Sequence, residues 1–307
     1  MVPATATAGG CETGAVNLLL ALVAVMGASA SGPLMAATHA PALAIAFWRN
    51  GFGTAALAPI VLTSRRAEIL TTTRREWRAA CFAGLMLAGH FATWVYALQL
   101  TSVAAATALV STQIVFVVLI NRLRGESVAR PVVIGTLCAI AGVLVISGVD
   151  FALSPKALLG DVLAIAGGLF AALYLVVGGS VRQRMSTTLY TFICYGSCAV
   201  ILLGAAVIAR QDVIHISGRD WLLIVAVTLT AQLLGHSLFN HLLAVMSPTV
   251  ISLVLLLEVP GAALLAAVFL HQLPGFGIYV GLILILAGLA VVVLTMRPQE
   301  DQVAVLD

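Results

Sequence analysis

Apolar stretches of similar length alternate with short polar connections along the whole chain. A helix needs about 20 mostly apolar residues to cross a bilayer, so each stretch predicts one transmembrane helix. The first five predicted spans are residues 17–35, 40–63, 78–100, 103–122 and 131–149. The second five are residues 158–179, 187–209, 221–244, 249–270 and 275–296. The pattern therefore predicts an all-α integral membrane protein with ten transmembrane helices.

The composition excludes a water-soluble globule. Of the 307 residues, 62% are hydrophobic and 9% are charged, whereas a soluble domain carries about 25% charged residues. No segment remains for a soluble catalytic or nucleotide-binding domain, nothing points to nucleic acid, and the partner expected around the protein is the lipid bilayer. The five cysteines form no C-x-x-C pair and are expected to pack within the membrane. No Lys or Arg precedes Arg49, so the first apolar run is expected to remain as a helix rather than to act as a signal peptide.

The two sets of five spans align with each other. A shift of 146 residues places residues 89–147 on residues 235–293 without gaps, with eight of 59 positions identical. The matches include Gly89-His90 on Gly235-His236 and Ala141-Gly142 on Ala287-Gly288. Glycines and a rare membrane histidine at one constant offset indicate duplication. We therefore expect repeats at residues 14–150 and 151–297, with cytoplasmic tails at residues 1–13 and 298–307.

An odd number of spans per repeat predicts that the second repeat is inverted in the membrane relative to the first. With both termini cytoplasmic, 11 of the 15 Lys and Arg residues fall in cytoplasmic segments and three in external ones, and Arg49 lies within a span. This distribution follows the positive-inside rule. Inverted repeats are typical of secondary transporters, in which one central site opens to either side.

Few charged residues lie deep within the predicted spans. Arg49 is near the middle of the second span and Glu258 near the middle of the ninth. A charge at that depth needs a partner or a water-filled cavity. Arg49 and Glu258 are therefore expected to form an ion pair or to face a zwitterionic substrate as separate poles, since a guanidinium binds a carboxylate through two donors. A fixed structural pair is the competing interpretation.

Polar and aromatic residues of the third and eighth spans are candidates for the wall of a cavity. His90 and Trp94 share one face of a regular helix, as do Gln232, His236 and Asn240. The 146-residue shift matches His90 with His236 and Trp94 with Asn240, so both faces are expected to meet the same central space.

Tyr174, which is more central in the sixth span than the aromatic residues near helix ends, is a further candidate for the cavity wall. His236 and His241 are five residues apart and do not share a helix face, so no metal site is predicted. Small-residue runs such as residues 27–32 allow close helix packing and are compatible with a homodimer.

The order and spacing of the segments described above resemble those of the drug/metabolite transporter superfamily with tandem EamA-type repeats. Arg49 lies where the family often has an arginine in the second span. The other segments that carry the resemblance are Leu159 to Ala164, Leu123 to Glu126, Gly235 to Asn240 and Leu257 to Gly261. His271-Gln272 and Ile114 depart from the family pattern, which commonly has Gly-Glu and Pro at these positions.

The resemblance implies a multi-pass protein of the inner membrane that exports amino acids, related metabolites or drugs. Together with the polar residues, it predicts alternating access around a cavity lined by Arg49, His90, Trp94, Tyr174, His236, Asn240 and Glu258. No catalytic residue, cofactor or ATP site is expected, because a Walker sequence is absent. Glu258 is the first candidate for carrying a coupled proton, followed by His90 and His236.

Two alternatives remain open from the sequence. The first is an uncoupled facilitator or importer on the same scaffold. The second is an intramembrane enzyme using His90, His236 or Glu258, although the chain contains neither H-E-x-x-H nor G-x-S-x-G. The substrate itself is not predicted beyond a small molecule.

Overall fold

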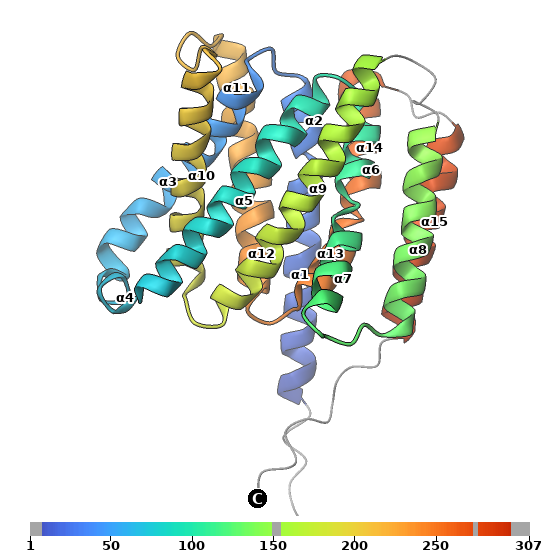
Figure 1. Cartoon of the computed structure of the whole chain (residues 1–307), viewed down its shortest axis with the longest axis horizontal. Helices are drawn as coiled ribbons and strands as arrows, with labels where there is room; N and C mark the ends of the chain where they lie inside the picture. The colour runs from blue at the N-terminus through green and yellow to red at the C-terminus, as the bar shows by residue number, and fades with distance from the viewer. Residues whose placement is uncertain (1–7, 149–154, 273–275, 296–307) are drawn as a thin grey trace, which may run out of the picture.

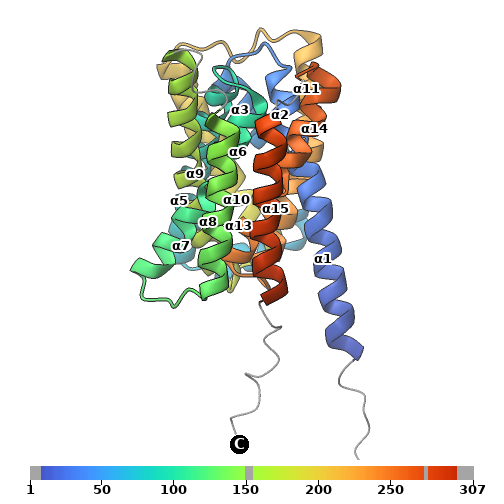
Figure 2. The same cartoon turned by 90° about the vertical axis from the view of Figure 1, so that its right-hand side faces the viewer.

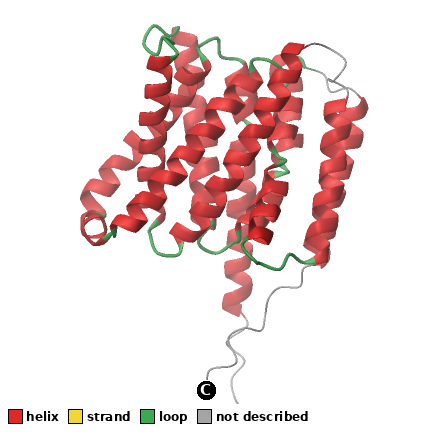
Figure 3. Ribbon diagram, viewed as in Figure 1, coloured by secondary structure: helices red, strands yellow, loops and turns green. Residues whose placement is uncertain are grey.

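The computed structural model describes residues 8–148, 155–272 and 276–295, and these residues form helices joined by short connections (Figure 3). The first repeat contains α1 (Ala8–Ser29), α2 (Ser31–Ala36), α3 (Ala42–Ser64), α4 (Arg66–Thr71), α5 (Arg74–Leu98), α6 (Val103–Val110), α7 (Gln113–Leu123) and α8 (Arg130–Gly148). The second contains α9 (Pro155–Arg182), α10 (Thr187–Ile208), α11 (Gly218–Val227), the π-helix η1 (Thr228–His236), α12 (Ser237–Leu242), α13 (Pro248–Leu255), α14 (Glu258–Leu270) and α15 (Phe276–Thr295).

Eight helical segments among the described residues are long and apolar enough to cross a membrane, compared with the ten expected. The two other expected spans correspond to α8 and α15. Their apolar parts are shorter, covering Arg130–Val145 and Tyr279–Gly288. Residues 1–7 of the tail predicted at residues 1–13 and the whole tail predicted at residues 298–307 lie outside the described residues, and α1 already begins at Ala8. The all-helical membrane fold is confirmed, whereas the count of ten spans and the position of the termini stay predictions.

The long helices run side by side between two faces of the molecule, and α8 and α15 lie together at one edge (Figures 1 and 2). We call one of them the α4 face, because α4 lies on it, and the other the α11 face, because α11 begins there. Large apolar side chains cover the outer surface, with Leu19 61% exposed and Leu222 73% exposed. Such a surface is suited to contact with lipid tails.

Serine and threonine caps explain where several helices begin. Ser102 accepts a hydrogen bond from the backbone N–H of Ala105, and Ser247 accepts one from Val250. Thr73 and Glu76 form a complete capping box at the start of α5. These side chains satisfy backbone donors that have no partner within the helix.

Glycines join α8 to α15 through reciprocal contacts. A Cβ on Gly142 would lie 2.5 Å from the carbonyl oxygen of Gly281, and a Cβ on Gly288 would lie 2.4 Å from that of Gly135. Both contacts therefore require glycine, since no Cβ fits at those distances. Gly135 and Gly142 are separated by 146 residues from Gly281 and Gly288, so exchanging the two repeats converts one contact into the other.

Candidate functional site

The fourth and ninth predicted spans are each interrupted near their middle. α6 ends at Val110 and α7 begins at Gln113, while α13 ends at Leu255 and α14 begins at Glu258. The two interruptions lie at positions that the 146-residue shift brings within one residue of each other. Discontinuous helices of this kind surround the substrate sites of many transporters, because they expose polar backbone within the membrane.

Different side chains interrupt the two spans. Pro260 has no N–H and its ring would clash with the carbonyl of Leu256, four residues earlier, so the helix is broken there and restarts just before the proline. The fourth span lacks this proline. There, the hydroxyl of Ser111 donates to the Thr107 carbonyl at 2.8 Å and that of Thr112 donates to the Leu109 carbonyl at 2.7 Å. Hydroxyl bonds of this type compete with helical backbone geometry.

A small cavity lies where these interruptions meet the third, sixth and eighth spans. Its volume is about 40 Å³, which is room for roughly three water molecules. The polar and aromatic side chains in its wall are His90, Trp94, Ser111, Gln113, Tyr174, His236, Phe239 and Glu258. A larger hollow of about 290 Å³ between α2, α11 and α14 has one polar side chain, Arg219, in its wall. The small cavity is therefore the better candidate site.

The two repeat-related histidines meet at this cavity. The ring centroids of His90 and His236 are 6.3 Å apart, and His90 stacks on Trp94 with centroids 5.6 Å apart. His90 Nδ1 lies 3.1 Å from the carbonyl oxygen of Gly167. Because a carbonyl only accepts, Nδ1 carries the hydrogen and Nε2 of the neutral ring is an acceptor. The His236 ring makes no hydrogen bond with any described residue.

Two further groups of the wall also lack partners. Trp94 is 2% exposed, and its indole N–H makes no hydrogen bond with any described residue. The Glu258 carboxylate likewise makes no hydrogen bond or ion pair within the described chain. It lies at the first position of α14, where the helix dipole favours a negative charge. Both a donor and a carboxylate are thus available to a ligand.

Arg49 lies behind the cavity rather than in its wall. Its Nε donates to Gln232 Oε1 at 2.8 Å and its Nη1 donates to the Ser31 hydroxyl at 3.1 Å. The guanidinium carbon is 4.1 Å from the centroid of the Phe91 ring, a cation–π contact. No carboxylate of the described residues lies within ion-pair distance of Arg49, so the expected ion pair with Glu258 is not formed.

The eighth span is not a regular α-helix, contrary to the geometry assumed from the sequence. Residues Thr228–His236 form a π-helix, in which the backbone bonds join residues five apart. Gln232 therefore faces Arg49 and Asn50, whereas His236 faces the cavity. Asn240 lies behind Tyr174, whose hydroxyl donates to the Asn240 side-chain oxygen.

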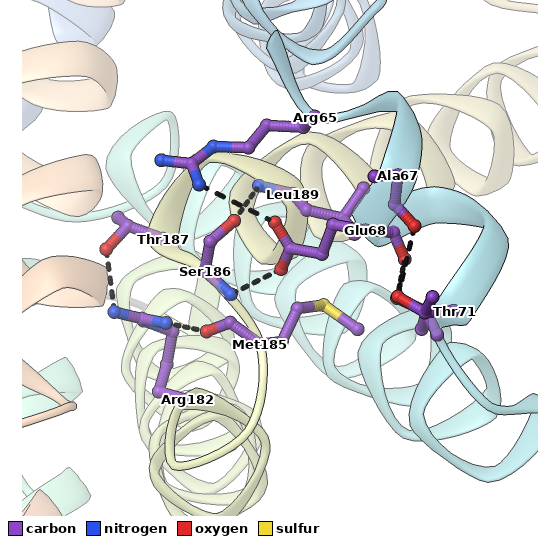
Figure 4. Close-up of polar contacts among 10 residues, drawn as sticks. Arg65, Ala67, Glu68, Thr71, Arg182, Met185, Ser186, Thr187 and Leu189 are labelled. Atoms are coloured by element: carbon purple, nitrogen blue, oxygen red, sulfur yellow. Dashed lines mark hydrogen bonds and ion pairs between the residues drawn. The ribbon is translucent and has the colours of Figure 1, made fainter.

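On the α4 face, a carboxylate of the first repeat holds a loop of the second repeat (Figure 4). Glu68 Oε1 accepts a hydrogen bond from the backbone N–H of Ser186 at 2.7 Å, and Glu68 Oε2 is 4.0 Å from Arg65. Arg182 shapes the same loop by donating to the Met185 carbonyl and to the Thr187 hydroxyl. Arg182 Nε also donates to the Asn240 carbonyl at 2.7 Å, which connects the loop to α12.

On the α11 face, the roles of the repeats are exchanged. Asp220 Oδ1 accepts from the backbone N–H of His39 at 3.2 Å, and Gln211 Oε1 accepts from Leu43 at 3.1 Å. His39 and Ser186 occupy equivalent connections, because Met185 is 146 residues from His39. Asp212 holds the loop before α11. It accepts hydrogen bonds from the backbone N–H groups of His215 and Ile214 and from the His215 ring, and these bonds lower the pKa of the Asp212 carboxyl to about 2. That carboxylate therefore stays ionised at neutral pH.

The fold and its central cavity define a multi-pass membrane protein built from two similar halves. The chain belongs to the EamA-like transporter family, whose model matches residues 16–148 and 158–294. This result confirms the family and the tandem repeat predicted from the sequence. No curated protein matches the chain. One solved structure, titled only as a crystal structure of a protein, has a TM-score of 0.72 at 20% identity. It covers 91% of this chain and 98% of its own, and it supports the fold alone.

Five of the seven residues predicted for the cavity lie in its wall: His90, Trp94, Tyr174, His236 and Glu258. Arg49 and Asn240 contact residues around the cavity instead. Ser111, Gln113 and Phe239 also line the cavity and are not among the residues predicted from the sequence. A polar Ser-Thr-Gln triplet within the fourth apolar run is the signal that identifies the first two.

Proposed function

We propose that the protein is a secondary transporter that moves a small molecule through the central cavity by alternating access. The observation that carries this proposal is the convergence of both repeats on one cavity. Interrupted helices of both repeats border it, and the repeat-related His90 and His236 face each other there. The reciprocal glycine contacts of α8 and α15 support an inverted arrangement of the repeats.

The cavity volume supports a closed state. A site for a drug-sized ligand has a volume of about 300–1,000 Å³, whereas this cavity measures about 40 Å³. An organic substrate therefore requires the surrounding helices to move apart. We propose that Glu68–Ser186 closes the path from the α4 face and that Asp220–His39 closes the path from the α11 face. Both contacts are present in this structure, and in our proposal they hold the protein in an occluded conformation.

Direction and coupling form a further part of the proposal. Membership of the family favours export from the cell across the inner membrane, of amino acids, related amphipathic metabolites or drugs. Glu258 is the proposed proton carrier, since it has no partner among the described residues and lies in the cavity wall. Uptake into proteoliposomes with and without a pH gradient tests this role. Glu258→Gln should abolish gradient-driven accumulation, and an unchanged response would rule out the role.

The closing contacts can be tested by thiol labelling. Ser111→Cys places a reporter in the cavity wall, and protein without this change accounts for the native cysteines. Adding Glu68→Ala should raise labelling by a membrane-impermeant reagent from one side of the membrane, and adding Asp220→Ala should raise it from the other side. Loss of one net hydrogen bond corresponds to about a threefold to tenfold increase.

Glu126→Ala is the matched control, because Glu126 is an exposed carboxylate paired with Arg124 at 3.9 Å. It should leave the labelling unchanged. Increased labelling from the same side with both variants, or no increase with either, would contradict alternating access through these contacts.

An uncoupled facilitator or importer is the second candidate on this scaffold. The 40 Å³ cavity fits it equally well, because occlusion has no direction. Equilibration without accumulation in the uptake experiment would favour it. Conversion of a substrate during the same experiment would instead indicate the intramembrane enzyme considered from the sequence.

A further inference from the structure

The acidic and the basic side chains of this region lie in different places, with Glu258 in the cavity wall and Arg49 outside it. Glu258 is the one acidic side chain among the residues that line the cavity, and none of these residues is Lys or Arg. Arg49 is not among these lining residues, and its guanidinium makes no ion pair with Glu258. Gln232 and Ser31 accept from its guanidinium, and the Phe91 ring covers it.

The other groups of the wall extend this acceptor character. His90 donates from Nδ1 to Gly167, which leaves Nε2 as an acceptor. The Tyr174 hydroxyl donates its hydrogen to Asn240, so its oxygen faces other groups as an acceptor. Trp94, Tyr174 and Phe239 add aromatic rings, whose faces attract cations. Donors are also present in the wall: the indole N–H of Trp94, the one N–H of the neutral His236 ring and the NH₂ group of the Gln113 amide.

From this arrangement we infer that the cavity selects a small organic ammonium ion, with Glu258 as its counter-charge and the aromatic rings around its carbon atoms. A carboxylate within a membrane protein needs a partner or a water-filled cavity, and no described Lys, Arg or His lies within ion-pair distance of Glu258, so a cation that enters the cavity gains this partner. A metal ion is a poorer match, because hard cations take six or more oxygen ligands or a fixed octahedral shell. The inference rests on the proposed transport function and specifies the chemistry of its substrate.

The inference changes the role expected for Arg49. As a pole for a substrate carboxylate, Arg49 would have to reach the cavity. Its contacts with Gln232 and Ser31 assign it instead to the packing of α3 against η1 and α2. A substrate with an additional acceptor atom could use the Trp94 N–H, which is free for such a bond.

Three probes with the same ring and different charge test the selection: benzylammonium, benzyl alcohol and benzoate. Each is titrated against the purified full-length protein while its thermal unfolding temperature is followed. Saturable stabilisation is expected from benzylammonium alone. Stabilisation by benzoate or by benzyl alcohol to the same degree would overturn the inference.

Glu258→Gln should weaken binding of benzylammonium by at least about 30-fold, because it removes the buried counter-charge. Glu126→Gln, an exposed carboxylate, should bind as the unchanged protein does. If Glu258→Gln does not fold, Glu258→Asp keeps the charge and should retain the preference for benzylammonium with a smaller stabilisation. Equal binding by Glu258→Gln, or loss of the preference in Glu258→Asp, would overturn the inference.

The Ser111→Cys labelling separates this inference from the proposed function. If Glu68→Ala and Asp220→Ala open opposite sides while no ammonium probe stabilises the protein, the ammonium inference fails and transport stands. If labelling does not respond to either variant while benzylammonium alone stabilises the protein, alternating access through these contacts fails and the ammonium selectivity of the cavity stands.

Discussion

The third spans of the two repeats contain the same Gly-His pair and fold differently. α5 is an α-helix from Arg74 to Leu98, whereas its counterpart passes through nine residues of π-helix. In α5, His90 is fixed by the carbonyl of Gly167 at 3.1 Å. In the second repeat, the carbonyl of Gln232 accepts from the Ser237 backbone and from the Tyr195 hydroxyl. Both histidines nevertheless reach the same cavity.

The difference shows how duplicated halves divide their tasks. The position equivalent to Gln232 in the first repeat is Met86, an apolar residue. Gln232 holds Arg49 and Asn50, the buried polar pair of α3. The second repeat therefore positions the buried guanidinium, while the first repeat supplies the ordered histidine and Trp94.

The largest loss of stability is expected when Gln232 can no longer hold Arg49 and Asn50. Gln232→Leu leaves the Nε of Arg49 and the side chain of Asn50 without these partners, and unsatisfied buried polar groups are costly. We expect a loss of about 3 kcal/mol in the free energy of unfolding. The measurement is unfolding in mixed micelles titrated with a denaturing detergent.

The repeat-equivalent Met86→Leu is the control for that change. It conserves volume and apolar character, so its cost should stay below about 1.5 kcal/mol. Similar losses from the two substitutions would contradict a special role of Gln232 in holding Arg49.

A smaller effect, equal in both halves, is expected between α8 and α15. Gly142→Ala and Gly288→Ala each place a Cβ against a backbone oxygen, at 2.5 and 2.4 Å. Each should lower stability by about 1–3 kcal/mol, the usual cost of overpacking. Gly204→Ala has open space around it and should stabilise by roughly 0.4–1 kcal/mol. A large difference between Gly142→Ala and Gly288→Ala would mean that the two contacts are not equivalent in energy.

The sequence predicts the helices and the repeat well, because apolar length and recurring glycines are local signals. It predicts the breaks less well: residues 103–122 are predicted as one span because the polar triplet Ser111-Thr112-Gln113 is short and apolar residues flank it. The hydroxyl bonds of Ser111 and Thr112 that bend this span become visible only in three dimensions.

The partners of Arg49 were also not predictable from the sequence. Charge alone suggests a carboxylate partner, but the structure supplies an amide, a hydroxyl and an aromatic ring. The π-helix that brings Gln232 to Arg49 has no periodic signature that distinguishes it from an α-helix. Side chains that depend on such irregular backbone are therefore the ones that sequence reasoning misplaces.

The smallest differences in stability are expected between variants of the two histidines. His90→Phe removes the bond to Gly167, whereas His236→Phe removes a ring that has no hydrogen-bond partner among the described residues. We expect a loss of about 1 kcal/mol in the first variant and less than about 0.5 kcal/mol in the second. Unfolding in mixed micelles measures both. Because His236 then contributes little to stability, any strong effect of His236→Phe on benzylammonium binding must arise in the cavity. Equal losses of stability would instead indicate that His236 is held as firmly as His90, and that the repeats differ in backbone but not in the role of this residue.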